Sequence, residues 1–278
     1  MTAEEYLKKF TAIKSFKDTG QKTVRLVKPN DGSAPVIIKV GKSSSPISFK
    51  RAKREVEVQT SLKSDYYPRN IDFILFDDNR FAIVEEYIES EALSGCFNRF
   101  TEPLDILTLL KHLISGLDLI WKLKITHRDL KPDNILIKPD KKPVIIDLGI
   151  ILAEDKTRLT GFFSPCGPCT PNYAAPEQLK NRRAQIDHRT DQFILGIDIL
   201  QLIEGGTHPF EPANIGVGAN IQENILNGNF LRVNLDSKKF ITMKNMVIKL
   251  LAPEPYKRFG NTEVLNKEIE KCIGAYHA

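Results

Sequence analysis

Short apolar stretches separated by turn-forming residues dominate the first third of the chain. Runs of β-branched and aliphatic residues of this length are typical of strands. We expect four of them, over residues 24–27, 36–40, 71–76 and 81–84. Pro-Asn-Asp-Gly at residues 29–32 and Asp-Asp-Asn at residues 77–79 supply turns between successive strands. Between the two strand pairs, residues 48–62 have the mixed apolar and charged pattern of a helix.

The rest of the chain is patterned mainly as helices. Residues 104–123 and 191–203 carry apolar side chains at helical spacing. Two short apolar segments between them, 135–137 and 144–146, indicate a pair of strands. Strands first and helices later predict an α+β fold. We expect a small β-rich N-lobe over residues 1–88, a larger α-helical C-lobe over residues 89–278, and a hinge at residues 86–90.

The composition is that of an ordinary globular protein, with 278 residues of which 41% are hydrophobic and 27% charged. The net charge of +5 is mild and its basic residues are dispersed, so binding of nucleic acid is not indicated. No apolar run approaches the ~20 residues that span a bilayer. The acidic N-terminus differs from a signal peptide, and four cysteines are too few for a disulfide scaffold. We therefore expect a soluble cytoplasmic protein with reduced thiols and no membrane span.

The most chemically specific segment is residues 127–134, which read His-Arg-Asp-Leu-Lys-Pro-Asp-Asn between a predicted helix and a predicted strand. Asp129 can accept or orient the proton of a hydroxyl group. Lys131 can offset charge on a phosphate, and Asn134 supplies a neutral oxygen that suits a hard cation. Thirteen residues later comes Asp147, the first residue of an Asp-Leu-Gly tripeptide. This loop can therefore hold a hydroxyl, a phosphate and a metal ion around one reaction centre.

Residues 127–134 resemble the catalytic loop of eukaryotic-type protein kinases, and the Asp-Leu-Gly tripeptide resembles their Asp-Phe-Gly motif. Residues 170–177, Thr-Pro-Asn-Tyr-Ala-Ala-Pro-Glu, are similar to the end of the kinase activation segment. Asp191 resembles the buried helix aspartate that braces the catalytic loop, and Arg258 resembles the arginine that pairs with Glu177. The resemblance covers roughly residues 15 to 272 and implies a single kinase domain built of two lobes.

The resemblance also implies the residues of an ATP site. The implied catalytic residues are Asp129, Lys131, Asn134 and Asp147, the last two as ligands of Mg²⁺, with Mn²⁺ as a substitute. Lys39 is similar to the strand lysine that contacts the α- and β-phosphates. Glu55 is its implied partner on the helix, with Glu57 as the fallback. Further nucleotide contacts are implied for Val24, Glu86, Ile88 and Leu136.

Two features of the N-lobe depart from the family pattern. The expected glycine-rich loop reads Lys-Asp-Thr-Gly-Gln-Lys-Thr at residues 17–23, where Gly20 is the single glycine. Glycines let backbone N–H groups approach phosphates closely, so three interpretations stay open: the loop binds ATP less tightly, it uses the side chains of Thr19, Lys22 or Thr23 instead, or it has diverged and still works. Glu85 takes the position behind the adenine that is usually apolar or Thr. Because a buried carboxylate needs a partner or a proton, it competes with Glu55 for Lys39, or the register is shifted by one residue.

A third departure is Cys166-Gly-Pro-Cys169 in the activation segment, which equals the thioredoxin redox motif as a string. A thioredoxin domain does not fit, because the segment runs directly into the kinase-like Thr170. Three interpretations stay open: a regulatory disulfide, a metal site shared with another chain, and two small side chains in a loop.

Together these features predict a protein Ser/Thr kinase that transfers the γ-phosphate of ATP to hydroxyl groups of protein substrates with Mg²⁺. The Ser/Thr specificity depends on Lys131 two residues after Asp129 and on Thr170-Pro171. Two alternatives stay open. The missing glycines favour a pseudokinase-type nucleotide-binding scaffold, and a small-molecule kinase of the aminoglycoside or choline type is the other. The resemblance also implies a homodimer that activates in trans. No motif in the sequence identifies the substrate or the upstream signal.

Overall fold

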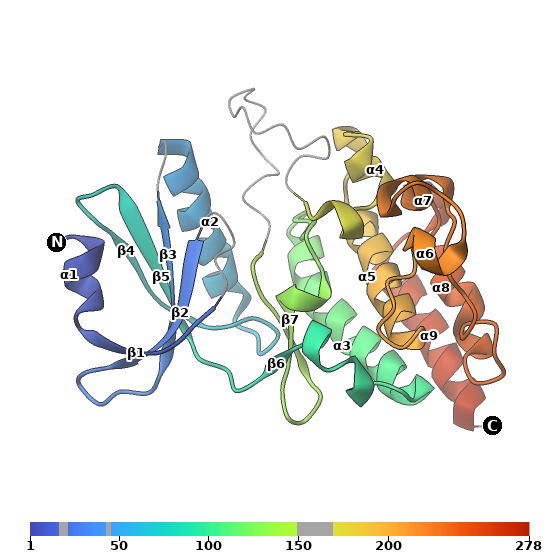
Figure 1. The fold of residues 1–278 in the computed structure, drawn as a ribbon, viewed down its shortest axis with the longest axis horizontal. Coiled ribbons are helices and arrows are strands. Elements are labelled where there is room, and N and C mark those ends of the chain that lie inside the picture. Colours follow the sequence, from blue (N-terminus) through green and yellow to red (C-terminus); the bar gives the residue numbers. More distant parts are fainter. Residues whose placement is uncertain (17–21, 43–45, 149–168, 278) are drawn as a thin grey trace. The chain divides into compact units, whose positions relative to one another are not determined.

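The computed structural model describes residues 1–16, 22–42, 46–148 and 169–277 (Figure 1). The chain divides into two compact units, Met1–Glu89 and Ser90–Ala278. The first unit is rich in strands and the second is mainly helical, which confirms the expected α+β fold. The elements of the first unit are α1 (Ala3–Leu7), β1 (Phe10–Ser15), β2 (Lys22–Pro29), β3 (Val36–Lys42), α2 (Pro46–Leu62), β4 (Asn70–Leu75) and β5 (Arg80–Glu86).

The strands of the first unit form one antiparallel sheet in the order β1-β2-β3-β5-β4. Each of the four strands expected from the sequence is present, as is the expected helix, now α2. Two elements were not expected. Helix α1 begins with a capping box, in which Thr2 and Glu5 bond each other's backbone N–H groups. Strand β1 adds an edge to the sheet through its pairing with β2.

The two helices of this unit cover opposite faces of the sheet (Figure 1). Successive side chains of a strand point to opposite faces, so β5 contributes to both. Its Ala82 and Val84 belong to a buried cluster that includes Ala3 of α1. Its Phe81 and Ile83 form a second cluster with Ala52 of α2. Glu85 follows the same alternation and therefore lies on the α2 face.

The second unit contains a small antiparallel sheet, in the order β6-β7-β8, and a set of helices. The strands are β6 (Glu91–Ala92), β7 (Ile135–Ile137) and β8 (Pro143–Ile145). The α-helices are α3 (Pro103–Lys122), α4 (Pro176–Leu179), α5 (His188–Ile203), α6 (Pro212–Ile215), α7 (Ile221–Asn227), α8 (Lys244–Leu250) and α9 (Thr262–His277). The 3₁₀ helices are η1 (Leu93–Gly95), η2 (Phe97–Arg99), η3 (Pro132–Asn134), η5 (Pro171–Tyr173), η6 (Arg183–Gln185), η7 (Ile241–Met243) and η8 (Pro255–Lys257). The two long helices and the strand pair expected here are confirmed.

Helix α5 is the centre of this unit. All its residues from Thr190 to Ile203 are buried, and it packs against α3 and α8. A helix that is buried on every side is a core helix, so the charged residues within it need internal partners. Asp191 in the first turn of α5 is one of them, and its partners are Trp121 of α3 and the backbone of the catalytic loop described below.

Two expectations about the chain's chemistry can be compared with the structure. Within the described residues, no helix combines the length and apolar character needed to cross a membrane. Cys96 and Cys272 are free thiols, but Cys169 is disulfide-bonded, so the expectation of reduced thiols is wrong for Cys169. Cys166 lies outside the described residues, as do Gly20 and Gly149.

Candidate active site

The backbone of the catalytic loop is held by the buried carboxylate of Asp191. Its Oδ2 accepts hydrogen bonds from the N–H of His127 and from the indole N–H of Trp121, both at 2.8 Å. Its Oδ1 accepts from the N–H of Arg128, also at 2.8 Å. Burial raises the pKa of the Asp191 carboxyl, and the nearby His127 together with these three donors opposes that effect. Asp191 therefore braces this loop, as the resemblance implied.

The loop takes an uncommon backbone conformation at Arg128, whose φ of 69° lies in the left-handed region. A non-glycine residue in this region is held there by its surroundings. Two hydrogen bonds hold the backbone of Arg128, one at its N–H and one at its carbonyl. The Arg128 N–H is bonded to Asp191, and the Arg128 carbonyl accepts a hydrogen bond from the side-chain amide of Gln178 at 2.9 Å. The oxygen of the same amide accepts from the N–H of Ala175 at 3.0 Å. Gln178 thus connects the start of α4 to the catalytic loop.

Asp129, the predicted catalytic base, is oriented by groups on both sides of its carboxylate. Its Oδ1 accepts hydrogen bonds from the N–H of Thr170 at 2.9 Å and from the Thr170 hydroxyl at 2.7 Å. Its Oδ2 accepts from the side-chain amide of Asn134 at 3.3 Å, and the same amide donates to the Asp129 carbonyl at 2.8 Å. The side chain is 29% exposed, so the carboxylate is fixed in direction and still reachable from solvent.

Lys131 lies beside this carboxylate. Its ammonium group donates to the Thr170 hydroxyl at 3.1 Å and lies 4.0 Å from Oδ2 of Asp129. Thr170 thus bridges the lysine and the aspartate, although 41 residues separate it from Asp129. The sequence places Thr170 at the start of the kinase-like segment that ends in Pro176-Glu177, six residues before Pro176, and predicts none of these contacts.

Asp147 lies two residues after the end of β8, and hydrogen bonds of the preceding residue, Ile146, hold the backbone in front of it. The N–H of Ile146 donates to the Asn134 carbonyl at 3.0 Å, and the Ile146 carbonyl lies 3.2 Å from Nε2 of His127. Asp147 itself has a φ of 55°, a second left-handed position in this site. The structure therefore anchors the segments that carry the two predicted metal ligands, Asn134 and Asp147, to each other through the backbone.

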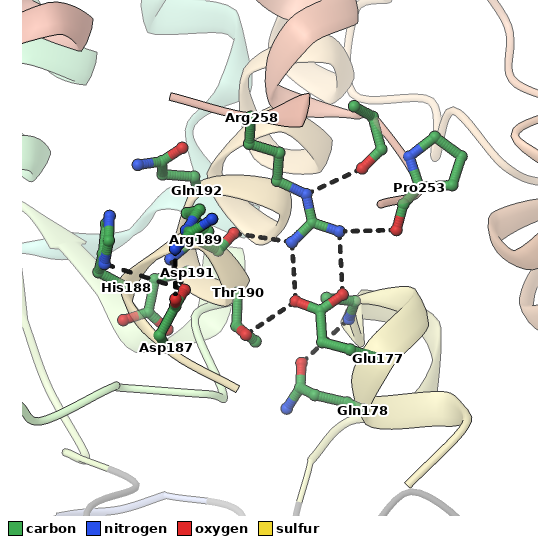
Figure 2. A network of polar contacts seen from close by, with 12 residues as sticks. Glu177, Gln178, Asp187, His188, Arg189, Thr190, Asp191, Gln192, Pro253 and Arg258 are labelled. Carbon is green, nitrogen blue, oxygen red and sulfur yellow. Dashed lines mark hydrogen bonds and ion pairs between the residues drawn. The ribbon is translucent and has the colours of Figure 1, made fainter. Parts of the chain in front are cut away.

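A buried ion pair joins Glu177 of α4 to Arg258, as Figure 2 shows. The guanidinium donates to the two carboxylate oxygens at 2.7 and 2.9 Å, and both side chains are fully buried. Its remaining donors reach backbone carbonyls of Arg189, Ala252 and Pro253. All five N–H groups of Arg258 are thereby used. Glu177 also accepts from the hydroxyl of Thr190 at 2.8 Å.

In the first unit, Lys39 of β3 forms an ion pair with Glu85 of β5, with Nζ 2.9 Å from Oε2. Glu55 of α2, the partner that the resemblance implied, accepts a hydrogen bond from Nζ of Lys22 on β2 at 2.9 Å. Of the two sequence-based interpretations of Glu85, the structure agrees with competition for Lys39. The register also leaves Glu85 in β5, opposite Ile37.

The remaining predicted nucleotide contacts lie in both units. Val24 on β2 is paired opposite Lys39, and Glu86 ends β5. Ile88 follows in the first unit, whereas Leu136 is the middle residue of β7 in the second. The carboxylate of Glu86 accepts a hydrogen bond from the N–H of Arg69 at 2.9 Å. Their role in nucleotide binding stays a prediction.

Comparisons with known proteins show which family the chain is similar to. A model of the protein kinase domain family matches residues 20–269. The chain is 27% identical over 231 residues to the serine/threonine-protein kinase pkn3 of Myxococcus xanthus, which covers 79% of this chain and 41% of that protein. It is 26% identical over 246 residues to the probable serine/threonine-protein kinase PknB of Lactococcus lactis, covering 86% and 38%. It is also 29% identical over 222 residues to the inactive serine/threonine-protein kinase PLK5 of Mus musculus, covering 75% and 34%. The aligned part of the chain thus spans about two fifths or less of the length of these relatives.

Proposed function

Because the chain belongs to the protein kinase domain family, we propose that it is the catalytic domain of a protein Ser/Thr kinase. It transfers the γ-phosphate of ATP to Ser and Thr hydroxyl groups of protein substrates. The observation that carries this proposal is the arrangement of Asp129, Lys131 and Thr170. A carboxylate oriented by three donors is paired with an ammonium group on the same loop.

In the proposed reaction, the hydroxyl oxygen of the substrate forms a bond to the γ-phosphorus while the bond from that phosphorus to the bridging oxygen of ADP breaks. Asp129 orients the hydroxyl group and accepts its proton. The ammonium group of Lys131 offsets negative charge on the phosphate in transfer. Thr170 holds the Asp129 carboxylate in the direction that this role requires.

Asn134 and Asp147 are the proposed ligands of Mg²⁺. An amide oxygen and a carboxylate suit a hard cation that completes its coordination with water and phosphate oxygens. The amide nitrogen of Asn134 makes both hydrogen bonds to Asp129, which leaves the amide oxygen for the metal ion. When bound, the ion neutralises charge on the phosphates. Mn²⁺, which accepts the same oxygen ligands, can replace it.

The nucleotide is proposed to contact Lys39 through its α- and β-phosphates. Adenine and ribose contacts are proposed for Val24, Glu86, Ile88 and Leu136. For the whole protein we also propose a cytoplasmic location, a protein substrate and a homodimer that activates in trans. The aligned part of the chain spans only part of the length of its relatives.

A transfer assay tests the proposed function. The purified chain is incubated with γ-labelled ATP, Mg²⁺ and a generic protein substrate, next to the variant Asp129→Ala and the control Asp140→Asn. Asp140 is an exposed carboxylate in the turn between β7 and β8, so the control changes charge without touching the site. We expect phosphoserine or phosphothreonine with the unmodified chain and with Asp140→Asn, and none with Asp129→Ala.

One observation favours the pseudokinase alternative: the chain is similar to an inactive kinase of Mus musculus. It predicts that the unmodified chain binds nucleotide but transfers no phosphate to any protein substrate. The small-molecule kinase alternative predicts transfer to an aminoglycoside or choline and none to protein. Either result contradicts the proposed function.

A further inference from the structure

The buried pair of Lys39 and Glu85 suggests how this chain positions its phosphate-contacting lysine. The side chains of Lys39 and Glu85 are 5% and 4% exposed, and their charged atoms lie 2.9 Å apart. An ionised group this deeply buried is stable only with an opposite charge and hydrogen bonds around it. Each of these two residues therefore requires the other in its charged form.

The register of the sheet makes this pairing an intrinsic property of the fold. In the antiparallel ladder, Lys39 of β3 lies opposite Ile83 of β5, and Ile37 lies opposite Glu85. Residues two apart on a strand share a face, and opposite residues of neighbouring strands do as well. Lys39 and Glu85 are therefore diagonal neighbours on the face that α2 covers, where long side chains can meet.

The second oxygen of Glu85 is also held. Its Oε1 accepts a hydrogen bond at 3.3 Å from the side-chain amide of Gln59 on α2. The same amide donates to the Pro68 carbonyl at 2.6 Å, so Gln59 is itself fixed in position. Glu85 thus has a donor on each oxygen, and the direction in which it presents its charge to Lys39 is set by two elements of the first unit.

Glu55 has a different charged neighbour. It lies four residues before Gln59 on α2, and its buried carboxylate accepts from Lys22 of β2 at 2.9 Å. In the ladder, Lys22 is opposite Gly41, so it projects from the same face of the sheet as Lys39. The face covered by α2 therefore carries two lysine–carboxylate pairs, one made within the sheet and one made between the sheet and the helix.

From this geometry we infer that Glu85 is the residue that positions Lys39 for the nucleotide phosphates, a task that the resemblance would give to Glu55. This inference rests on the proposed function in one respect, namely that Lys39 contacts phosphate. Because the positioning carboxylate belongs to the sheet, the direction of Lys39 is set by a contact within the sheet. Glu85 acts through Lys39 and is a positioning residue, not a catalytic one.

The first test measures the lysine itself. In a chain labelled with ¹⁵N-lysine, an ammonium group held in a buried ion pair exchanges its protons slowly and gives a visible NMR signal. We expect the Lys39 signal, assigned through Lys39→Met, to vanish in Glu85→Gln and to persist in Glu55→Gln. Persistence in Glu85→Gln with loss in Glu55→Gln would overturn the inference. This measurement needs no phosphate transfer, so its outcome is separate from that of the proposed function.

The second test compares nucleotide binding and turnover in the same two variants. Misplacing a substrate-contacting group by about 1 Å costs roughly 100-fold in rate, so Glu85→Gln should lower kcat/KM for ATP by about 10- to 100-fold. Glu55→Gln removes an equally buried carboxylate and is the comparison; it should lower kcat/KM for ATP by clearly less than Glu85→Gln does. A larger loss in Glu55→Gln than in Glu85→Gln contradicts the inference.

A double variant excludes a merely structural effect. If Glu85 acts through Lys39, then Glu85→Gln should weaken binding of a fluorescent ATP analogue in the unmodified chain and add nothing in the Lys39→Met background. Equal weakening in both backgrounds would show that Glu85 supports nucleotide binding by another route, and would overturn the positioning role.

Discussion

Replacing Arg258 by methionine is expected to destabilise the second unit by about 3–5 kcal/mol, the usual cost of breaking a buried ion pair by removal of one partner. The structure explains why the cost falls in this range. Glu177 would keep its charge at a fully buried position, with the Thr190 hydroxyl as its remaining side-chain donor. The carbonyls of Arg189, Ala252 and Pro253 would each lose a charged donor as well.

Thermal unfolding followed by circular dichroism measures this loss. Natural domains are stable by only about 5–15 kcal/mol, so the loss is a large fraction of the total. For a unit of this size, each kcal/mol lowers Tm by about 2–4 °C, and we expect a fall of about 6–20 °C. The matched control is Arg232→Met. Arg232 is 57% exposed and lies 3.7 Å from Asp236, so its loss should shift Tm by less than about 2 °C.

A double-mutant cycle tests the physical reason. Once Arg258 is gone, Glu177→Gln removes the buried charge that makes the single variant costly. The pair Glu177→Gln and Arg258→Met should therefore cost clearly less than the sum of the two single changes. Equal Tm values for Arg258→Met and Arg232→Met, or strict additivity in the cycle, would refute the reasoning.

Three further predictions concern single residues. Thr170→Val removes the hydroxyl that bonds Asp129 and should lower kcat about tenfold, with Thr170→Ser restoring it; an unchanged kcat would contradict the orienting role. Burial lowers the pKa of His208 to about 4, so the unfolded chain binds this proton at a higher pH than the folded chain. Stability should fall by up to about 3 kcal/mol as the pH drops from about 6.5 to 4, and His208→Gln should flatten that part of the denaturation profile. Reduction of the disulfide at Cys169, next to Thr170, should lower kcat several-fold; equal activity in strong reductant and mild oxidant would exclude this effect.

The strands and helices that could be predicted from the sequence are those whose burial requires a run of apolar residues or a helical period. Strands β2, β3 and β5 and helix α5 are of the first kind, and helix α3, which buries one side, is of the second. Strand β1 gives no such signal, because five of its six side chains are exposed and it is held by backbone pairing to β2. Helix α1 has five residues, too few for a period to show, although its capping box was present in the sequence.

Part of the candidate site could likewise be predicted from the sequence, and part depends on the fold. Asp129, Lys131 and Asn134 lie within one short loop, so their proximity follows from the sequence, and the fold adds Thr170 from 41 residues away. The partner of Lys39 could not be predicted, because carboxylates at positions 55 and 85 are both within its reach. Both carboxylates lie on the side of the sheet that α2 covers, and the register of β3 and β5 makes Glu85 a diagonal neighbour of Lys39.

The most direct test of the proposed function is a single-turnover experiment with γ-labelled ATP, in which phosphate transfer and nucleotide affinity are measured on the same sample. With Asp129→Asn, transfer to serine and threonine should slow by about 10²- to 10⁴-fold, the usual contribution of a general base. The affinity for ATP should stay within about threefold, because the proposed contact of Asp129 is with the hydroxyl group and not with the nucleotide. Transfer at an unchanged rate in this variant, or transfer of phosphate to tyrosine alone, would contradict the role proposed for Asp129 and the Ser/Thr specificity.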